Sequence, residues 1–76
     1  MPYKYYEKIR EMREDRKLSQ QDIADLLHIG QRTYSDYETG KTRIPVESVI
    51  ALAKFYDVDL NYLTGISQEK NPFPEK

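Results

Sequence analysis

Apolar residues along this chain recur at the spacing of helices and nowhere alternate with polar residues over a sustained stretch. Between about Tyr5 and Arg16, the residues Tyr5, Ile9 and Met12 fall at positions i, i+4 and i+7, while most other positions are charged. Such a stripe is typical of an amphipathic helix that buries one face. The first segment is therefore predicted to be a helix.

A second helix is predicted to begin at a capping motif. Ser19 and Asp22 have the spacing at which a hydroxyl accepts a free backbone N–H and the acidic side chain reaches back to the cap. Ile23, Leu26 and Leu27 are expected to face the core, and the helix is expected to end near Leu27.

A three-residue break at 28–30 separates this helix from a third one, predicted over about 31–39. Gly40 follows it, and glycine readily takes the left-handed conformation that ends a helix. Tyr34 and Tyr37 are expected to be core residues that orient this helix. Stacking on single-stranded nucleic acid is the alternative role for the two tyrosines.

Two more helices are predicted after the third. Pro45 is expected to start the fourth helix, about 46–56, from its first turn. Asp59 is expected to cap a short fifth helix at 60–64, which Gly65 ends. The face of the fourth helix that we expect to be buried consists of Val46, Val49, Ile50, Ala53 and Tyr56.

The predicted architecture is all-α: one compact domain of five helices over 5–65. Residues 66–76 contain two prolines and one aromatic residue, Phe73, and are expected to form an extended or disordered tail.

The composition fits one small domain and excludes several kinds of site. The chain has 76 residues, 33% of them charged, and its 12 basic and 13 acidic residues nearly balance. It has no cysteine and one histidine, His28, which excludes a thiolate or multi-histidine metal centre, so no metal and no cofactor are expected. We expect a cytoplasmic protein that is not an enzyme, because there is no signal-peptide-like or membrane-spanning stretch and no nucleophile–base spacing.

The second and third predicted helices have the arrangement of a helix-turn-helix, at about 19–39. Two short helices joined by three residues, one of them glycine, hold the second helix outward across the first. Glutamine bonds bidentately to adenine and arginine to guanine in the major groove. The outer face of the second helix carries hydrogen-bonding side chains, namely Gln31, Arg32, Ser35 and Asp36.

Residues next to this unit are candidates for contacts with the DNA backbone. Gln20 and Gln21 open the second helix, where free backbone N–H groups and the positive dipole end favour a phosphate. Lys41, Thr42 and Arg43 follow the third helix, where they are expected to meet the backbone beside the groove. Ordinary solvated positions remain the alternative for Lys41 and Arg43, and for Gln31 and Arg32.

Three stretches of the sequence resemble the Cro/C1-type (XRE family) helix-turn-helix transcriptional regulators: LSQQDIA at 18–24, YETGK at 37–41 and LAKFYDVDLNYL at 52–63. The resemblance covers about residues 5–65. It implies a lambda-repressor-like five-helix domain that binds operator DNA, usually as a two-fold dimer.

The resemblance also implies roles for individual residues. Gln31, Arg32 and Asp36 match base-contacting positions, with Ser35 beside them, and Gln20, Lys41 and Arg43 match phosphate-contacting positions. Arg13 and Glu38 match a largely buried ion pair between the first and third helices, with separate surface charges as the alternative. Leu60 and Tyr62 match positions where related repressors dimerise, with packing inside one chain as the alternative.

Three residues depart from the family pattern. His28 stands where glycine is common, and histidine tolerates a left-handed backbone. Gly30 replaces the usual Ser or Thr cap of the third helix, without a side-chain bond. Asp36 puts an anion on the outer face, where it accepts from cytosine N4, pairs with Arg32, or repels phosphate.

The sequence therefore predicts a sequence-specific regulator of transcription, most simply a repressor, that binds double-stranded DNA as a homodimer and inserts helix 31–39 into the major groove. The alternative is a protein-interaction module, such as the antitoxin half of a toxin–antitoxin pair. Near-neutral charge and Asp36 favour this alternative, with the tail around Phe73 as the docking segment.

Overall fold

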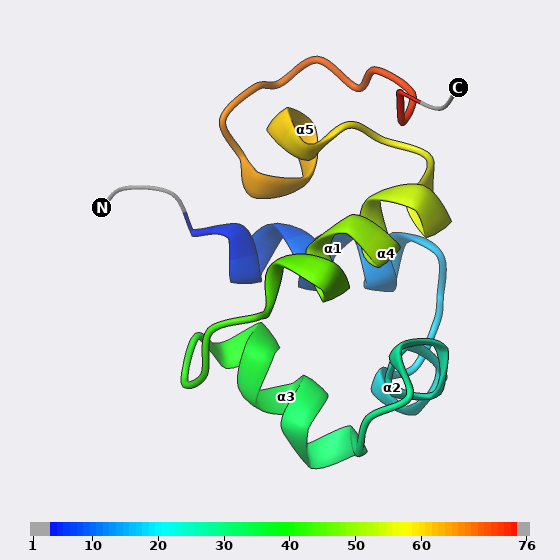
Figure 1. The fold of residues 1–76 in the computed structure, drawn as a ribbon, viewed down its shortest axis with the longest axis vertical. Coiled ribbons are helices and arrows are strands. Elements are labelled where there is room, and N and C mark those ends of the chain that lie inside the picture. Colours follow the sequence, from blue (N-terminus) through cyan, green and yellow to red (C-terminus); the bar gives the residue numbers. More distant parts are fainter. Residues whose placement is uncertain (1–3, 75–76) are drawn as a thin grey trace.

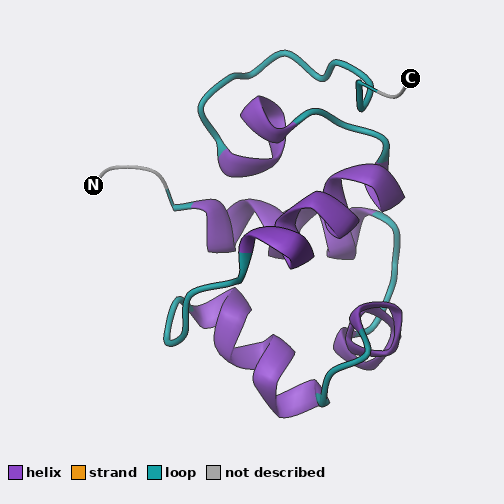
Figure 2. Cartoon of the chain, in the orientation of Figure 1, coloured by secondary structure: helices purple, strands orange, loops and turns teal. Residues whose placement is uncertain are grey.

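The computed structural model describes residues 4–74, which fold into five helices and contain no strand. This confirms the all-α prediction (Figures 1 and 2). The helices are α1 (Tyr5–Asp15), α2 (Gln20–Leu27), α3 (Gln31–Thr39), α4 (Val46–Tyr56) and α5 (Leu60–Thr64). Among the described residues, no helix is long and apolar enough to cross a membrane.

The helices are arranged so that the two ends of the molecule carry different elements. In Figure 1, α2 and α3 lie at one end, α1 and α4 cross the middle, and α5 lies at the other end beside the C-terminal stretch. α3 packs against both α2 and α1, while α5 packs against α1 and α4. The orientation of α3 therefore depends on two other helices.

Short polar side chains begin two of the helices, as the sequence predicts. The Asp22 N–H donates to the Ser19 hydroxyl at 3.0 Å, and the Ser19 N–H donates to the Asp22 carboxylate at 2.9 Å. At α5, the Tyr62 N–H donates to the Asp59 carboxylate at 2.9 Å. These bonds satisfy N–H groups that have no partner inside the first turn of a helix.

The residues at the other helix boundaries explain the tight connections. His28 ends α2 in the left-handed conformation (φ 60°), which histidine was expected to tolerate. Gly40 ends α3 with φ 79°, and a Cβ there would lie 3.1 Å from the Tyr6 ring, so glycine suits both conformation and space. Pro45 corrects one prediction: its extended ψ of 153° makes it the cap before α4 and not a residue of its first turn.

The buried face of α4 is rotated about the helix axis relative to the predicted face. Leu52 is completely buried, together with Ala53 and Tyr56, whereas Val46 is 63% and Ile50 39% exposed. The half-buried Val49 completes an i, i+3, i+4, i+7 stripe through 52, 53 and 56, and Val46 and Ile50 lie outside this stripe. Leu26 on α2 was also predicted to face inward and is 39% exposed, since Ile23, Ala24 and Leu27 form the inward face there.

Residues 66–74 form no helix, but they return to the body of the molecule. The Asn71 carbonyl accepts the Asp59 N–H at 3.0 Å, and the Phe73 N–H donates to the Asp57 carboxylate at 3.2 Å. The half-buried Phe73 packs against the core, with the Lys54 ammonium 6.0 Å from its ring centroid. The tail therefore covers the α4–α5 connection, at the end of the molecule remote from α2 and α3 (Figure 1).

Candidate nucleic-acid interface

A tight turn joins α2 to α3. The Ile29 N–H donates to the Ala24 carbonyl at 3.0 Å, and the His28 N–H donates to the Asp25 carbonyl at 3.2 Å. These bonds close the end of α2, and α3 begins two residues later with the extended Gly30 as its cap. Because glycine has no side chain, Gly30 cannot accept a hydrogen bond from the free backbone N–H groups in the first turn of α3.

The inner face of α3 is fixed by two aromatic side chains. Tyr34 is completely buried and Tyr37 is 6% exposed, and their rings meet edge to face with centroids 6.3 Å apart. This confirms the prediction that both are core residues, and their burial leaves no face free for stacking on a nucleobase. With these rings inside, the rest of the first turn of α3 must face outward.

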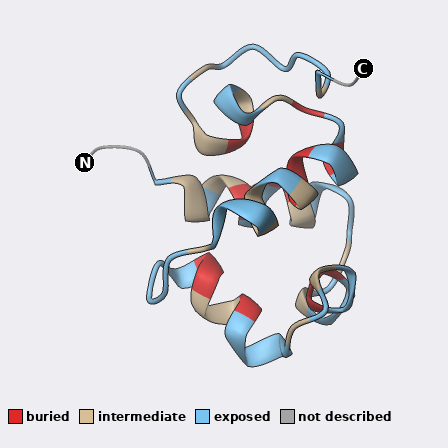
Figure 3. Ribbon diagram, in the orientation of Figure 1, coloured by how far each residue is buried: buried red, intermediate tan, exposed pale blue. Residues whose placement is uncertain are grey.

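The outward residues of the first turn are polar. Gln31 and Arg32 are exposed, and so is Thr33, a hydrogen-bonding residue that was not among the predicted DNA contacts. Figure 3 shows this end of α3 as an exposed tip of the molecule. The rest of the chain within residues 4–74 therefore leaves Gln31 and Arg32 open to solvent.

Ser35 and Asp36 lie one turn further along and are half-buried. The Asp36 carbonyl accepts the backbone N–H groups of Lys41 at 3.0 Å and Thr42 at 3.3 Å, which folds the following loop back onto the end of α3. Within residues 4–74, Arg32 and Asp36 form no ion pair. The Arg32 guanidinium is therefore not held by Asp36 at the i, i+4 spacing.

The loop after α3 presents two cations beside the C-terminal end of that helix. Lys41, Thr42 and Arg43 are all exposed. None of the ion pairs within residues 4–74 involves Lys41 or Arg43. The two backbone bonds to the Asp36 carbonyl hold the backbone of the loop against the end of α3.

The two glutamines at the start of α2 differ in their partners. The Gln20 amide nitrogen donates to the Glu38 carboxylate at 3.1 Å, and Gln20 is half-buried. The Gln21 amide nitrogen donates to Asp25 at 2.8 Å, one turn along the same helix, and Gln21 is exposed. The sequence gives no signal for the Gln20–Glu38 contact, because it joins residues 18 apart on different helices.

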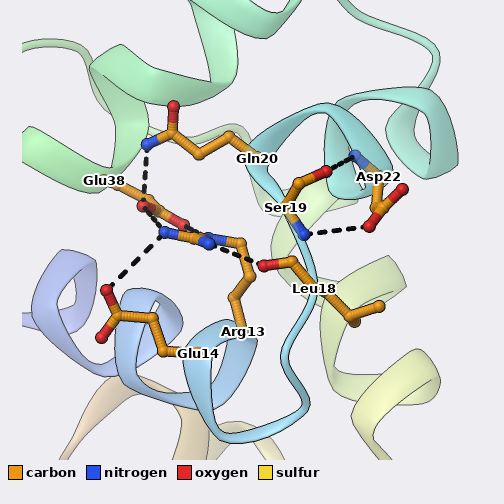
Figure 4. A network of polar contacts seen from close by, with 7 residues as sticks. All are labelled: Arg13, Glu14, Leu18, Ser19, Gln20, Asp22 and Glu38. Atoms are coloured by element: carbon orange, nitrogen blue, oxygen red, sulfur yellow. Dashed lines mark hydrogen bonds and ion pairs between the residues drawn. The ribbon is translucent and has the colours of Figure 1, made fainter.

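The structure brings Arg13 and Glu38 together at the centre of a polar network (Figure 4). Arg13 Nε donates to Glu38 Oε2 at 2.7 Å, and Arg13 Nη2 donates to Oε1 at 3.1 Å. Arg13 Nη1 donates to the Leu18 carbonyl at 2.7 Å. Glu38 is 3% exposed, so this two-bond pair is largely withdrawn from water.

Opposing effects act on the titration of this network. Burial by itself would raise the pKa of Glu38, but its hydrogen bonds, above all that from Arg13, outweigh burial and hold this pKa below its ordinary value. The hydrogen bond to Glu38 raises the pKa of Arg13. Burial, followed by the nearby Glu38 anion, raises the pKa of Tyr34. Arg13 and Glu38 are therefore charged, and Tyr34 neutral, at neutral pH.

The two candidate dimer residues lie on α5, at the opposite end from the outward face of α3. Leu60 is 38% exposed and borders an apolar groove. Tyr62 is half-buried, and the Lys8 ammonium lies 4.3 Å from its ring centroid. Arg43 and Thr64 also line this groove, together with the apolar residues Tyr5, Ile9, Ile44, Val46, Val49 and Leu63.

No group of three or more His, Asp or Glu residues within 4–74 is placed to hold a metal ion. The single histidine, His28, is exposed in the turn between α2 and α3. The chemistry of this end of the molecule is therefore hydrogen bonding and charge, carried by amide, guanidinium, ammonium and backbone N–H groups.

The chain matches a known protein family and is similar in sequence to known regulators of transcription. The helix-turn-helix family (HTH_3) matches residues 9–63. The uncharacterized HTH-type transcriptional regulator YobD of Bacillus subtilis (strain 168) is 28% identical over 72 residues, covering 95% of this chain and 64% of that protein. The cryptic phage CTXphi transcriptional repressor RstR of Vibrio cholerae is 39% identical over 61 residues, covering 80% and 55%.

A solved structure has the same fold. The crystal structure of a transcriptional regulator from Listeria innocua matches with a TM-score of 0.82 and 28% identity, covering 91% of this chain and 64% of that one. This chain therefore spans somewhat more than half, and less than two thirds, of the length of these three relatives.

Proposed function

Because the chain belongs to the helix-turn-helix family, we propose that it is a sequence-specific regulator of transcription, most simply a repressor, which inserts α3 into the major groove of double-stranded DNA. The observation that carries this proposal is the division of α3 into two faces. Tyr34 and Tyr37 are buried, while Gln31 and Arg32 stand exposed at the tip of the molecule. A helix held in this way can enter a groove about 12 Å wide.

In this proposal the outward residues of α3 select the bases. Gln31 pairs bidentately with adenine, and Arg32 with guanine O6 and N7. The absence of an ion pair between Arg32 and Asp36 leaves the guanidinium available for this contact. Ser35 and the Asp36 carboxylate lie one turn further along, where Asp36 accepts from cytosine N4 and disfavours other bases at that position.

Contacts with phosphates set the register of the protein on the duplex. The start of α2, with Gln20 and Gln21, offers free N–H groups and the positive end of the helix dipole to one phosphate. Lys41, Thr42 and Arg43 meet the backbone on the other side of α3. The chain has a net charge of −1, so this local arrangement of donors, and not overall charge, must provide the attraction.

A homodimer places two copies of α3 in successive major grooves, about 34 Å apart on one face of the duplex. Leu60 and Tyr62 on α5 are the proposed contacts between the two copies. Leu60 is one of the large apolar side chains that remain partly exposed. Its helix, α5, lies at the other end of the molecule from the first turn of α3. Repression then follows by occupation of the operator.

The proposal is tested by titration with duplexes selected from a random pool, compared with a scrambled duplex, at two salt concentrations. A steep loss of affinity with salt and a preference for the selected sequence are expected. Equal affinity for both sequences would contradict base selection, and no binding to either duplex would contradict the proposed function. In that case the protein-interaction alternative, which near-neutral charge favours, would stand.

A further inference from the structure

We propose that Glu38 is a positioning residue for DNA binding: its buried carboxylate, held by Arg13, fixes the side-chain amide of Gln20 at the first turn of α2. This inference rests on the proposed function and goes beyond it. It gives Glu38 a second role besides joining α1 to α3, because the same carboxylate orients a side chain at the proposed DNA-binding end.

The geometry of the carboxylate carries the inference. Its Oε2 atom accepts from Arg13 Nε at 2.7 Å. Its Oε1 atom accepts from both Arg13 Nη2 and Gln20 Nε2, each at 3.1 Å (Figure 4). Two parallel bonds from a planar guanidinium fix the plane of the carboxylate. The direction from which Gln20 can reach Oε1 is thereby fixed as well.

An ionised carboxylate also determines which way round the Gln20 amide lies. A carboxylate only accepts hydrogen bonds, so the amide must turn its nitrogen towards Glu38 and its oxygen away, as Figure 4 shows. The Nε2 atom keeps a second proton for another acceptor. A phosphate oxygen at the start of α2 is such an acceptor, because the backbone N–H groups of Gln20 and Gln21 have no partner within the helix.

The neighbouring Gln21 provides the contrast. Its amide nitrogen is bonded to Asp25, an exposed residue of the same helix, and no buried charge stands behind that contact. Ordering a glutamine side chain costs up to about 2 kcal/mol of rotamer freedom. Glu38 already orders the Gln20 side chain when the chain folds, so DNA binding does not have to order it again. A side chain that rotates freely in the free protein loses this rotamer freedom on binding, which weakens the affinity.

The first test measures order in the free protein and needs no variant. Nitrogen relaxation of the side-chain amide is expected to give Gln20 an order parameter near that of rigid backbone, about 0.85. The exposed Gln68 in the tail, which makes no side-chain bond among residues 4–74, should fall below about 0.6. A Gln20 amide as mobile as that of Gln68 would overturn the inference.

The second test is a double-mutant cycle on the affinity for the selected duplex, with Glu38→Gln, Gln20→Ala and the double variant. Each single change is expected to weaken binding about 3- to 10-fold, as for one lost hydrogen bond, and the double variant to be no weaker than the worse single one. The matched cycle with Gln21→Ala in place of Gln20→Ala should be additive.

The results of these tests distinguish failure of the inference about Glu38 from failure of the proposed function. Additive losses from Gln20→Ala and Glu38→Gln, with wild-type binding intact, would overturn this inference and leave the proposed function standing. No duplex binding by the wild-type chain would overturn both. If Glu38→Gln does not fold, the relaxation measurement on the wild-type chain still decides whether Gln20 is held.

Discussion

Arg13 Nε lies 2.7 Å from Glu38 Oε2, although the two residues are 25 positions apart in the sequence. Arg13 belongs to α1, and Glu38 is the penultimate residue of α3. The pair therefore fixes the proposed DNA-binding helix to a helix that does not touch DNA in this account. Removing one partner of such a buried pair is costly, because the other is left charged and without compensation.

The stability of the protein is expected to depend on the charge of Glu38. Its pKa in the folded protein lies below the ordinary value of 4.5, so the folded state binds fewer protons than the unfolded state as the pH falls. The contribution of Glu38 is therefore complete above about pH 4.5 and is lost as the pH falls through the folded-state pKa. Urea unfolding of wild type and Glu38→Gln from pH 7 to pH 3 measures this.

The free energy of unfolding of wild type should fall more steeply below pH 4.5 than that of Glu38→Gln, which has no carboxylate at position 38. The other acidic groups are the same in both proteins, so the difference reports on Glu38. Parallel curves would show that its pKa is not lowered by folding.

Arg32→Ala is expected to weaken binding to the selected duplex by about 1–3 kcal/mol and to relax selectivity at one base step. Lys54→Ala is the matched control, because it also removes one exposed cation but lies on α4 beside the tail. Affinities for duplexes that differ at single base pairs measure the effect. A loss of equal size on every sequence would mean that Arg32 contacts only the backbone.

Lys41→Ala is expected to behave differently, because a phosphate contact does not depend on sequence. It should weaken binding to all duplexes alike and reduce the slope of log affinity against log salt by about 1. Titrations at several salt concentrations give this slope. If the slope matches that of the wild type, Lys41 lies away from the phosphates.

Leu60→Asp is expected to shift the chain to a monomer and to reduce its affinity for an operator with two half-sites. An aspartate at the centre of an apolar contact places an unpaired charge there. Phe55→Asp is the control, since Phe55 is similarly exposed, at 41% against 38% for Leu60, but lies on α4. Sedimentation equilibrium measures the change, and an unaltered dimer in Leu60→Asp would place the interface elsewhere.

The number and extent of the helices were predictable because local signals agree with one another. Ser19 and Asp59 cap helices, Gly40 and Gly65 end them, and apolar residues recur at the helical spacing between them. The identity of the proposed base-contacting residues followed from the same periodicity, once Tyr34 and Tyr37 were assigned to the core.

The remaining features depend on contacts between helices, which one-dimensional periodicity does not contain. The fourth helix has apolar residues over much of its circumference, so the sequence did not reveal that Leu52 is buried while Val46 is exposed. The return of Phe73 to Asp57 and the contact of Gln20 with Glu38 each join parts of the chain more than ten residues apart. Neither contact leaves a local signal.

The central claim is that the exposed face at the start of α3 is the part of the molecule that meets DNA. Amide chemical shifts of the labelled chain, followed while the selected duplex is added, test this most directly. The account predicts the largest changes at residues 31–36, with smaller ones at 20–21 and 41–43 and little change at 66–74. Changes concentrated on α4, α5 or the tail, with 31–36 unaffected, would contradict it.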